Sequence, residues 1–160
     1  MQFSPATPHH SSTALTLVRR CAAAPEIEVA FTLSLTADDR GRSRHYFESV
    51  EGHPLYLNLP RGTLLRHGDV LEADGDQRRV RVIAKPEPVM IVTGETSLDL
   101  LRAAYHLGNR HVALELAVND IRLAPDPVLK TMLEQLGLQV VEDVTPFHPE
   151  AGAYGHLHTH

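Results

Sequence analysis

The sequence has little cysteine, few aromatic residues and no excess of basic residues. Of its 160 residues, one is cysteine, none is tryptophan, and only four each are phenylalanine and tyrosine. A single cysteine, Cys21, excludes an internal disulfide and a four-thiolate zinc site. Lys and Arg number 15 against 20 Asp and Glu. This acidic balance argues against a general nucleic-acid binder, which needs basic patches to neutralise phosphates. No apolar run approaches the ~20 residues that a membrane span needs.

The common catalytic motifs are also missing. There is no nucleophile elbow, no Gly-rich phosphate loop and no His-Glu-x-x-His pair. Residues 1–25 are predicted to form a disordered leader, so Cys21 within it is a poor candidate nucleophile. The leader does not resemble a signal peptide, because its apolar part, Ala14–Val18, is short and precedes the basic pair Arg19–Arg20. We therefore expect a cytoplasmic protein that is not an enzyme.

Histidine, in contrast, is abundant, with 11 residues. Imidazole is the commonest metal ligand in proteins. Four of the histidines belong to a predicted flexible tail, residues 148–160: His148, His156, His158 and His160. In an extended chain the last three point to one side, about 6.6 Å apart per step. The ligand set favours Ni, Zn or Cu(II). The tail reaches up to ~43 Å when extended. The alternative, a purification tag, is usually an unbroken run, whereas GHLHTH is interrupted.

A second candidate is the stretch Gly108-Asn109-Arg110-His111. On its own it reads as a helix-ending turn with a solvated arginine and a surface histidine. One histidine holds a transition metal poorly, but a twofold dimer would present His111 from both chains. His106 is more simply explained as a histidine near a helix C-terminus, where a positive charge is favourable. The remaining histidines are expected to be ordinary surface residues: His9, His10, His45, His53 and His67.

Residues 26–86 are predicted to form a small all-β domain. Short alternating segments favour strands at 26–35, 46–50, 55–57, 70–73 and 78–84. Asp74-Gly75 between the last two is a strong hairpin signal. Arginines at 40–44, 61, 66 and 78–81 make this domain locally positive. They form either a solvated face or a docking surface for an acidic protein.

The pattern changes after the stiff break Lys85–Pro88. Strands are expected at 89–92, 111–118, 121–123 and 138–144, with helices at 98–107 and 128–136. Ser97 is the expected cap of the first helix, which carries Leu98, Leu101 and Tyr105 on one side and ends at Gly108. The second helix is expected to begin at Asp126 and Pro127 and to end at Gly137. The resulting βαββαβ order over residues 87–147 predicts a ferredoxin-like domain. The fold class is therefore α+β.

Three stretches of the chain resemble the UreE family of urease accessory proteins. In the β-domain they are Leu59–Thr63 and Leu65–Leu71, similar to the LPRG…L-x-x-G-D-x-L signature of that family. In the second domain Tyr105–His111 matches its most specific motif. Near the end, Pro146–Phe147 and Pro149–His156 match the beginning of its tail. The likeness extends from about Val29 to His160, and the leader has no counterpart.

The resemblance implies a nickel metallochaperone. His111 would be the interface ligand donated by each subunit of a homodimer or tetramer, with His156, His158 and His160 completing the coordination. His148 and His106 are weaker metal candidates. Gly108, Asn109 and Arg110 belong to the motif. The family passes Ni(II) to the urease apoprotein complex, where an accessory GTPase takes it up; Zn(II) or Cu(II) can substitute. The stretch 123–127 lacks the extra histidines of some members, so no auxiliary site is expected, and the short tail indicates about one ion per dimer.

Two other functions remain to be weighed. In one, the protein is an assembly chaperone whose β-domain engages a client, and metal binding is incidental or serves storage. In the other, the same histidines serve a metallohydrolase. The hydrolase has little support, because ligands from two chains and a mobile tail provide neither a general base nor a shaped pocket. No nucleic-acid or membrane partner is expected.

Overall fold

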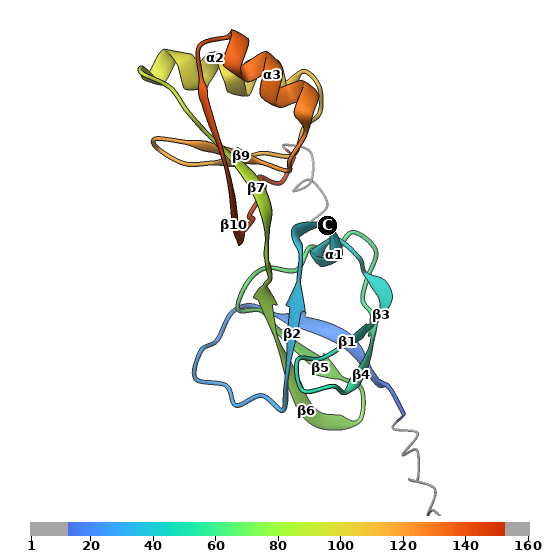
Figure 1. The fold of residues 1–160 in the computed structure, drawn as a ribbon. Coiled ribbons are helices and arrows are strands. Elements are labelled where there is room, and N and C mark those ends of the chain that lie inside the picture. Colours follow the sequence, from blue (N-terminus) through green and yellow to red (C-terminus); the bar gives the residue numbers. More distant parts are fainter. Residues whose placement is uncertain (1–12, 153–160) are drawn as a thin grey trace, which may run out of the picture. The chain divides into compact units, whose positions relative to one another are not determined.

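The computed structural model describes residues 13–152 and divides the chain into two compact units (Figure 1). The first unit comprises Met1–Ser34 and Arg40–Ile83, and the second comprises Leu35–Asp39 and Ala84–His160. Two hydrogen bonds join the two pieces of the second unit. The amide of Lys85 donates to the carbonyl of Leu35 over 2.8 Å. The amide of Ala37 donates to the Glu87 carboxylate over 2.7 Å.

The first unit is built on a six-stranded sheet. Its strands are β1 (Leu15–Cys21), β2 (Phe31–Leu35), β3 (Arg44–Glu48), β4 (Pro54–Asn58), β5 (Val70–Ala73) and β6 (Asp76–Ala84), in the spatial order β2-β6-β5-β1-β4-β3. The β1–β4 pair is parallel, whereas β1–β5, β3–β4 and β5–β6 are antiparallel. Alternate residues of the strands point inward, as a half-buried sheet requires, and Leu17, Leu55 and Leu57 are fully buried. The hairpin predicted at Asp74-Gly75 joins β5 to β6, with Gly75 at φ 69°.

The expectation of a disordered leader is wrong from Leu15 onward. Strand β1 lies inside the sheet between β4 and β5, and Cys21 is its last residue. In sequence, this strand differs from a polar segment only by its two inward-facing leucines. A pattern this short does not predict a strand. The first 12 residues, with His9 and His10, lie outside the described part. A one-turn helix, α1 (Ala37–Arg40), was not predicted either.

The second unit has the predicted βαββαβ order. Its elements are β7 (Pro86–Thr93), α2 (Ser97–Gly108), β8 (Glu115–Leu116), β9 (Ile121–Leu123), α3 (Pro127–Gln135) and β10 (Gln139–Pro146). The sheet has the order β10-β7-β9-β8, and all three strand pairs are antiparallel. The strand expected at 111–118 is reduced to β8, because the turn that ends α2 extends to His111 and residues 112–114 have no regular secondary structure. No helix in residues 13–152 is long and apolar enough to cross a membrane.

Both helices pack on one face of this sheet. The shared core contains Met90, Val92, Ile121 and Leu123 from the strands and Ala103, Leu107 and Leu133 from the helices. Because side chains alternate along a strand, the intervening residues belong to the opposite face. Cross-strand pairing aligns Val141, Ile91, Arg122 and Glu115 in one row there. We call this the open face.

The helix starts follow local capping chemistry. Asp126 caps α3, accepting hydrogen bonds from the amides of Val128 (2.8 Å) and Leu129 (3.0 Å), as predicted. Helix α2 is capped by Thr96 and not by Ser97, which is its first helical residue. Thr96 and Asp99 bond each other's amides in a capping box, which satisfies two donors that a helix start otherwise leaves free.

Candidate metal site

The turn after α2 carries His111, the main candidate ligand. Two hydrogen bonds close this turn: the amide of His111 donates to Gly108 over 2.9 Å, and the amide of Val112 donates to Leu107 over 3.2 Å. This pair of bonds is the pattern of a Schellman motif, which satisfies carbonyls at a helix end. Its characteristic left-handed residue is His111, with φ 56°. The imidazole is on an exposed residue at the end of α2.

The backbone of His111 is in a conformation that glycine normally supplies. A side-chain-bearing residue in the left-handed region loses about 1–2 kcal/mol relative to its relaxed backbone. His111 is the only non-glycine residue with positive φ among the described residues. A strained residue of this kind is a reason to look for function at that position. Its exposed imidazole is of the ligand type that suits Ni, Zn and Cu ions.

The other motif residues build the turn. The amide of Asn109 donates to Tyr105 over 3.0 Å, which continues the helical bonding by one residue beyond Gly108. The guanidinium of Arg110 donates from Nη1 to the carbonyl of His106 over 2.9 Å, so it binds one of the last carbonyls of the helix. Gly108 is the last residue of α2, and a Cβ added there would meet nothing within 4 Å. The left-handed role is therefore carried by His111 and not by Gly108.

The remaining candidate ligands are not assembled around His111 within the described chain. No group of three or more His, Cys, Asp or Glu residues close enough to hold a metal ion occurs among residues 13–152. His106 is half-buried, and its ring meets that of Tyr105 edge to face, with centroids 5.6 Å apart. His148 is exposed. His156, His158 and His160 lie outside the described residues, so their part in metal binding stays a prediction.

One side of α2 is apolar and exposed. Leu98, Leu101 and Tyr105 share it, as expected, but they are 51%, 66% and 67% exposed and do not form the core-facing side. The core contact is made by a different set, Leu100, Ala103 and Leu107. Helix α2 therefore has apolar residues on two sides, and its own domain covers only one of them. The stripe of Leu98, Leu101 and Tyr105 leads along α2 towards the turn of His111.

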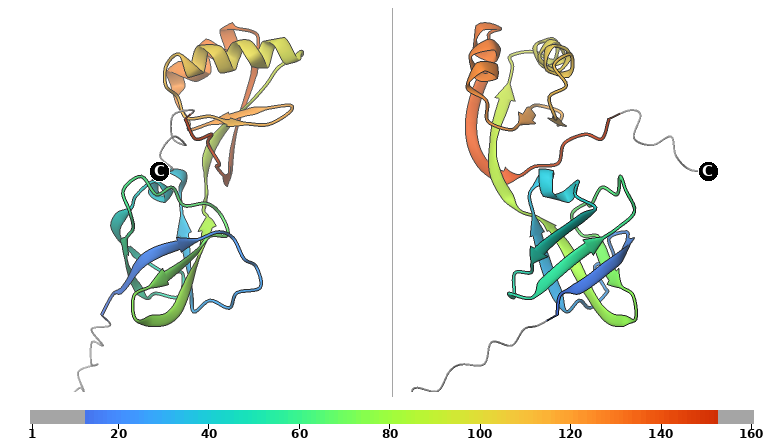
Figure 2. Two further views of the ribbon diagram at one scale, coloured as in Figure 1. Left: turned by 180° about the vertical axis from the view of Figure 1, so that it is seen from behind. Right: turned by 90° about the vertical axis from the view of Figure 1, so that its right-hand side faces the viewer.

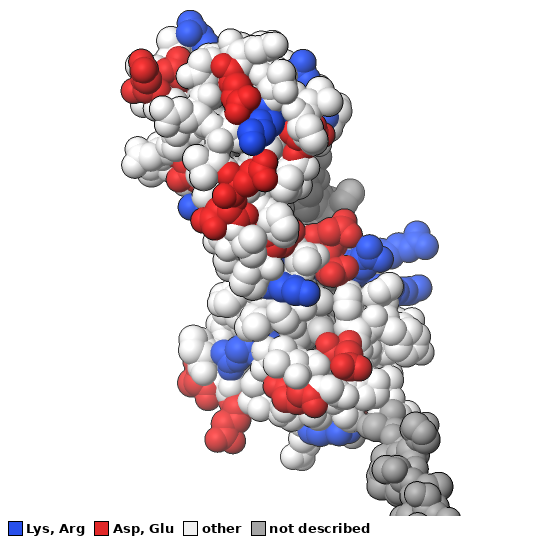
Figure 3. Space-filling view, in the orientation of Figure 1, with Lys and Arg blue, Asp and Glu red and all other residues white. Residues whose placement is uncertain are grey.

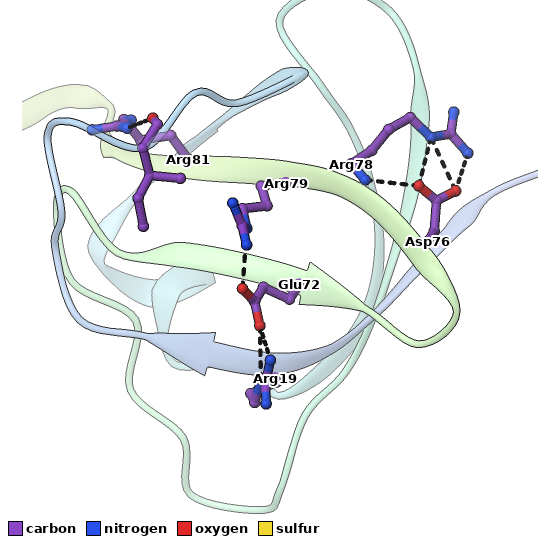
Figure 4. A network of polar contacts seen from close by, with 7 residues as sticks. Arg19, Glu72, Asp76, Arg78, Arg79 and Arg81 are labelled. Carbon is purple, nitrogen blue, oxygen red and sulfur yellow. Dashed lines mark hydrogen bonds and ion pairs between the residues drawn. The ribbon is translucent and has the colours of Figure 1, made fainter.

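Several charges on strands β1, β5 and β6 of the first unit are paired. On neighbouring strands, Glu72 lies between Arg19 and Arg79 and binds both (Figure 4). Hydrogen bonds from Arg19 hold the pKa of the Glu72 carboxyl below its usual range. Arg78 binds Asp76 and lowers its pKa to about 2. Acidic and basic side chains are interspersed on the face drawn in Figure 3. The arginines at 78 and 79 thus belong to ion pairs rather than to an uncompensated basic surface.

Some residues of interest were not singled out from the sequence. Glu115 and Arg122, on the open face, form an ion pair, and Glu115 also accepts a hydrogen bond from the segment that follows β10. An isolated acidic residue in a two-residue strand carries no signal of this. The stripe on α2 was named from the sequence as one side of the helix, but its exposure was not predicted, although a second apolar set with helical spacing is present in the same twelve residues.

Comparisons with known proteins agree with the resemblance. The family model described as the UreE urease accessory protein N-terminal domain matches residues 14–85, and that of its C-terminal domain matches residues 87–160. The chain is 50% identical over 146 residues to the urease accessory protein UreE of Nostoc sp. strain PCC 7120, covering 91% of this chain and 99% of that protein.

Other relatives extend the match. UreE of Thermosynechococcus vestitus is 52% identical over 143 residues, with 89% of this chain and 99% of that protein covered. For UreE of Burkholderia vietnamiensis the identity is 49% over 138 residues, with 86% and 68% covered. These proteins are accessory factors for urease and not enzymes, in agreement with the expectation from the missing catalytic motifs. The chain therefore belongs to the UreE family of urease accessory proteins.

Proposed function

We propose that the protein serves urease maturation by carrying Ni(II), which it binds with His111 and delivers to the urease apoprotein complex. The observation that carries the proposal is the backbone of His111, which has φ 56° where glycine would be relaxed. An exposed histidine at this position lowers the stability of the folded protein and brings no structural benefit. Nickel is the cargo of this function. Zn(II) and Cu(II) compete for the same site, because imidazole ligands follow the general affinity order of these metals.

The complete site needs ligands from more than one part of the assembly. A single imidazole holds Ni(II) weakly, and residues 13–152 of one chain offer no cluster around it. We propose that two copies of His111 meet in a homodimer and that His156, His158 and His160 supply further ligands. An exposed apolar stripe marks an interaction surface, and that of α2 ends at the turn of His111. A twofold interface through this stripe would bring both copies of the turn together.

Titration calorimetry of the full chain with Ni(II) tests the ligand. His111→Ala keeps the left-handed backbone strain but removes the imidazole, and we expect its Ni(II) affinity to fall at least tenfold. His106→Ala, five residues earlier, is the matched control and should bind as the wild type does. Unchanged binding by His111→Ala would remove this residue from the site. If urease activation also survived, the alternative of an assembly chaperone with incidental metal binding would be favoured.

The solution mass tests the dimer. Leu101→Asp places a charge in the middle of the exposed stripe and should convert the dimer to monomer. Val128→Asp is a suitable control, because Val128 is 77% exposed on the other helix. A dimer that survives Leu101→Asp would exclude the stripe as the interface. The number of Ni(II) ions bound per dimer separates delivery from storage. Delivery predicts one ion per dimer, whereas storage would require many ions per chain.

We further propose that the protein acts in the cytoplasm with an accessory GTPase and that its second unit is a ferredoxin-like domain. The strand order β10-β7-β9-β8 and the βαββαβ sequence of elements support the fold assignment. Residues 26–86 would then dock partners, and residues 87–147 would present the metal site. Co-purification of the GTPase with the wild type and with a Glu72→Lys variant tests docking through the paired charges of β1, β5 and β6. Equal recovery would place docking elsewhere.

A further inference from the structure

The segment after β10 crosses the second unit from one edge of its sheet to the other. Strand β10 is one edge and β8 is the opposite one. Beyond Pro146, the chain leaves β10 and runs across to the far side, as the dark red segment in Figure 2 shows. Two backbone amides fix it there: that of His148 donates to Glu115 Oε2, and that of Glu150 donates to the carbonyl of Leu114, each over 2.7 Å. We call residues 147–150 the strap.

The strap is short and extended. The four residues from Pro146 to Glu150 span at most ~14 Å when fully extended. Burial along the strap alternates as it does in an extended chain: Phe147 is buried and Pro149 half-buried, while His148 and Glu150 are exposed. The expectation of a flexible tail from His148 onward is therefore wrong for its first three residues, which are bonded to the β8 edge.

The acceptor on the β8 edge is itself held in place. The guanidinium of Arg122 reaches Glu115 Oε1 over 3.4 Å and Asp120 Oδ1 over 2.9 Å. Glu115 thus uses one carboxylate oxygen for Arg122 and the other for the strap. Its side chain lies on the open face, in the row that also contains Ile91. An ion pair of this kind is worth little by itself, but it orients the carboxylate towards the amide of His148.

The anchored end of the strap is close to His111. Leu114, which accepts the bond from Glu150, follows His111 by three residues, so their Cα atoms are at most ~11 Å apart. His156 follows Glu150 by six residues, which limits its reach from the anchor to ~20 Å. A tail released at Pro146 would instead begin at the opposite edge of the sheet, with four more residues before His156.

We propose that the strap, fixed by Glu115, positions the tail histidines beside His111. The inference rests on the proposed nickel-binding function and gives Glu115 the part of a positioning residue. Shortening the tether and starting it near His111 raises the effective concentration of the tail imidazoles at the metal. The tether length alone accounts for about a twofold gain, because effective concentration falls with the −3/2 power of length. The shift of the starting point across the sheet adds to this gain.

The test compares Glu115→Ala with Glu115→Gln in the full-length protein. Alanine removes the acceptor, so the amides of His148 and Glu150 should exchange hydrogen faster, and Ni(II) affinity should fall about two- to fivefold. Glutamine keeps an acceptor oxygen without the charge and should restore both properties. Hydrogen exchange of these amides and calorimetry with Ni(II) alone are the two measurements.

A background without tail imidazoles separates positioning from a merely structural role. In the triple variant His156→Ala, His158→Ala and His160→Ala, adding Glu115→Ala should not change Ni(II) affinity any further. An equal loss in that background would mean that Glu115 acts on the fold and would overturn the inference. So would fast exchange of the strap amides in the wild type, or unchanged Ni(II) affinity in Glu115→Ala with the strap released.

The experiment also distinguishes a failure of the strap from a failure of the proposed function. If the wild type did not bind Ni(II), or if His111→Ala bound it equally well, the proposed function would fail and the positioning role with it. Slow exchange at His148 and Glu150 would then still report an intact strap. If Ni(II) bound tightly through His111 and its affinity did not change when the strap was released, only the positioning role would be overturned.

Discussion

The two helices of the second unit end in the same turn made with different residues. After α3, the amide of Gly137 donates to Glu134 and that of Leu138 to Leu133, over 3.0 and 3.1 Å. After α2 the corresponding bonds involve His111 and Val112. The left-handed position is Gly137 at φ 84° in one turn and His111 at φ 56° in the other.

This comparison separates what the turn needs from what the site needs. The turn after α3 shows that glycine satisfies the backbone, and its hydrogen bonds are as short as those after α2. In both turns the next residue packs on the same core: Leu138 is buried in it and Val112 is half-buried against it. The imidazole of His111 therefore has no structural duty in ending α2. A residue that carries strain without a structural duty is best explained by its chemistry.

The largest expected effect is that of His111→Gly, which makes the two turns alike. Nickel affinity should fall at least tenfold, while the free energy of unfolding should rise by about 1 kcal/mol because glycine relieves the left-handed strain. Calorimetry with Ni(II) and urea denaturation measure the two changes. His111→Ala provides the control, since it loses the ligand without relieving the strain. A loss of stability in His111→Gly would show that the imidazole supports the turn after all.

The reverse change is Gly137→Ala, which introduces strain into the turn after α3. We expect the free energy of unfolding to fall by about 1–2 kcal/mol, with Ni(II) affinity unchanged. Gly108→Ala is a matched control, because Gly108 is not in the left-handed region and has open space for a Cβ. It should be neutral or slightly stabilising in urea. Equal destabilisation by both alanines would refute the conformational explanation.

The starts of the two helices differ as well. Asp126→Ala tests the start of α3, which has the simpler cap. Asp126 alone accepts two amides at the start of α3, so its removal should lower the free energy of unfolding by about 1 kcal/mol. Urea denaturation followed by circular dichroism measures this. Asp126→Asn, which keeps an acceptor oxygen, should recover most of the loss. No recovery would indicate that the carboxylate has a role other than capping.

The smallest effect is expected at the capping box of α2. Hydrogen bonds from Thr96 lower the pKa of Asp99, so its ionised form is favoured in the folded state. That contribution is fully present above the ordinary carboxyl range and is lost as pH falls through the lowered pKa. Asp99→Asn should therefore flatten the acid side of the stability profile slightly, without changing Ni(II) affinity at neutral pH. Thermal unfolding between neutral and acidic pH would detect it, and an unchanged acid limb would refute it.

Local chemistry was readable from the sequence where a few adjacent residues decide the outcome. Asp74-Gly75 predicts the hairpin between β5 and β6, and Asp126-Pro127 predicts the start of α3. The order of elements after Lys85 follows from alternating apolar periods bounded by glycine and proline. The Gly108–His111 motif identifies the family, which the comparisons confirm.

Predictions failed where distant partners decide. β1 is ordered because β4 and β5 pair with it from both sides. A short polar-rich segment does not reveal in its own sequence that such strands will pair with it. The face of α2 that carries Leu101 has the same helical spacing as a core face, and only the position of the sheet decides which side is covered. The backbone angle of His111 is equally invisible, since the same letters would suit a solvated turn.

By itself, the sequence determined the family, the two-part organisation and the residue types available to bind a metal, because these depend on short-range patterns and composition. The tertiary structure alone decided that His111 is strained, that the stripe on α2 is exposed and that the strap reaches Glu115. Each of these depends on contacts between residues far apart in the chain, as between His148 and Glu115. Such contacts follow from how strands are ordered in a sheet, which no local pattern encodes.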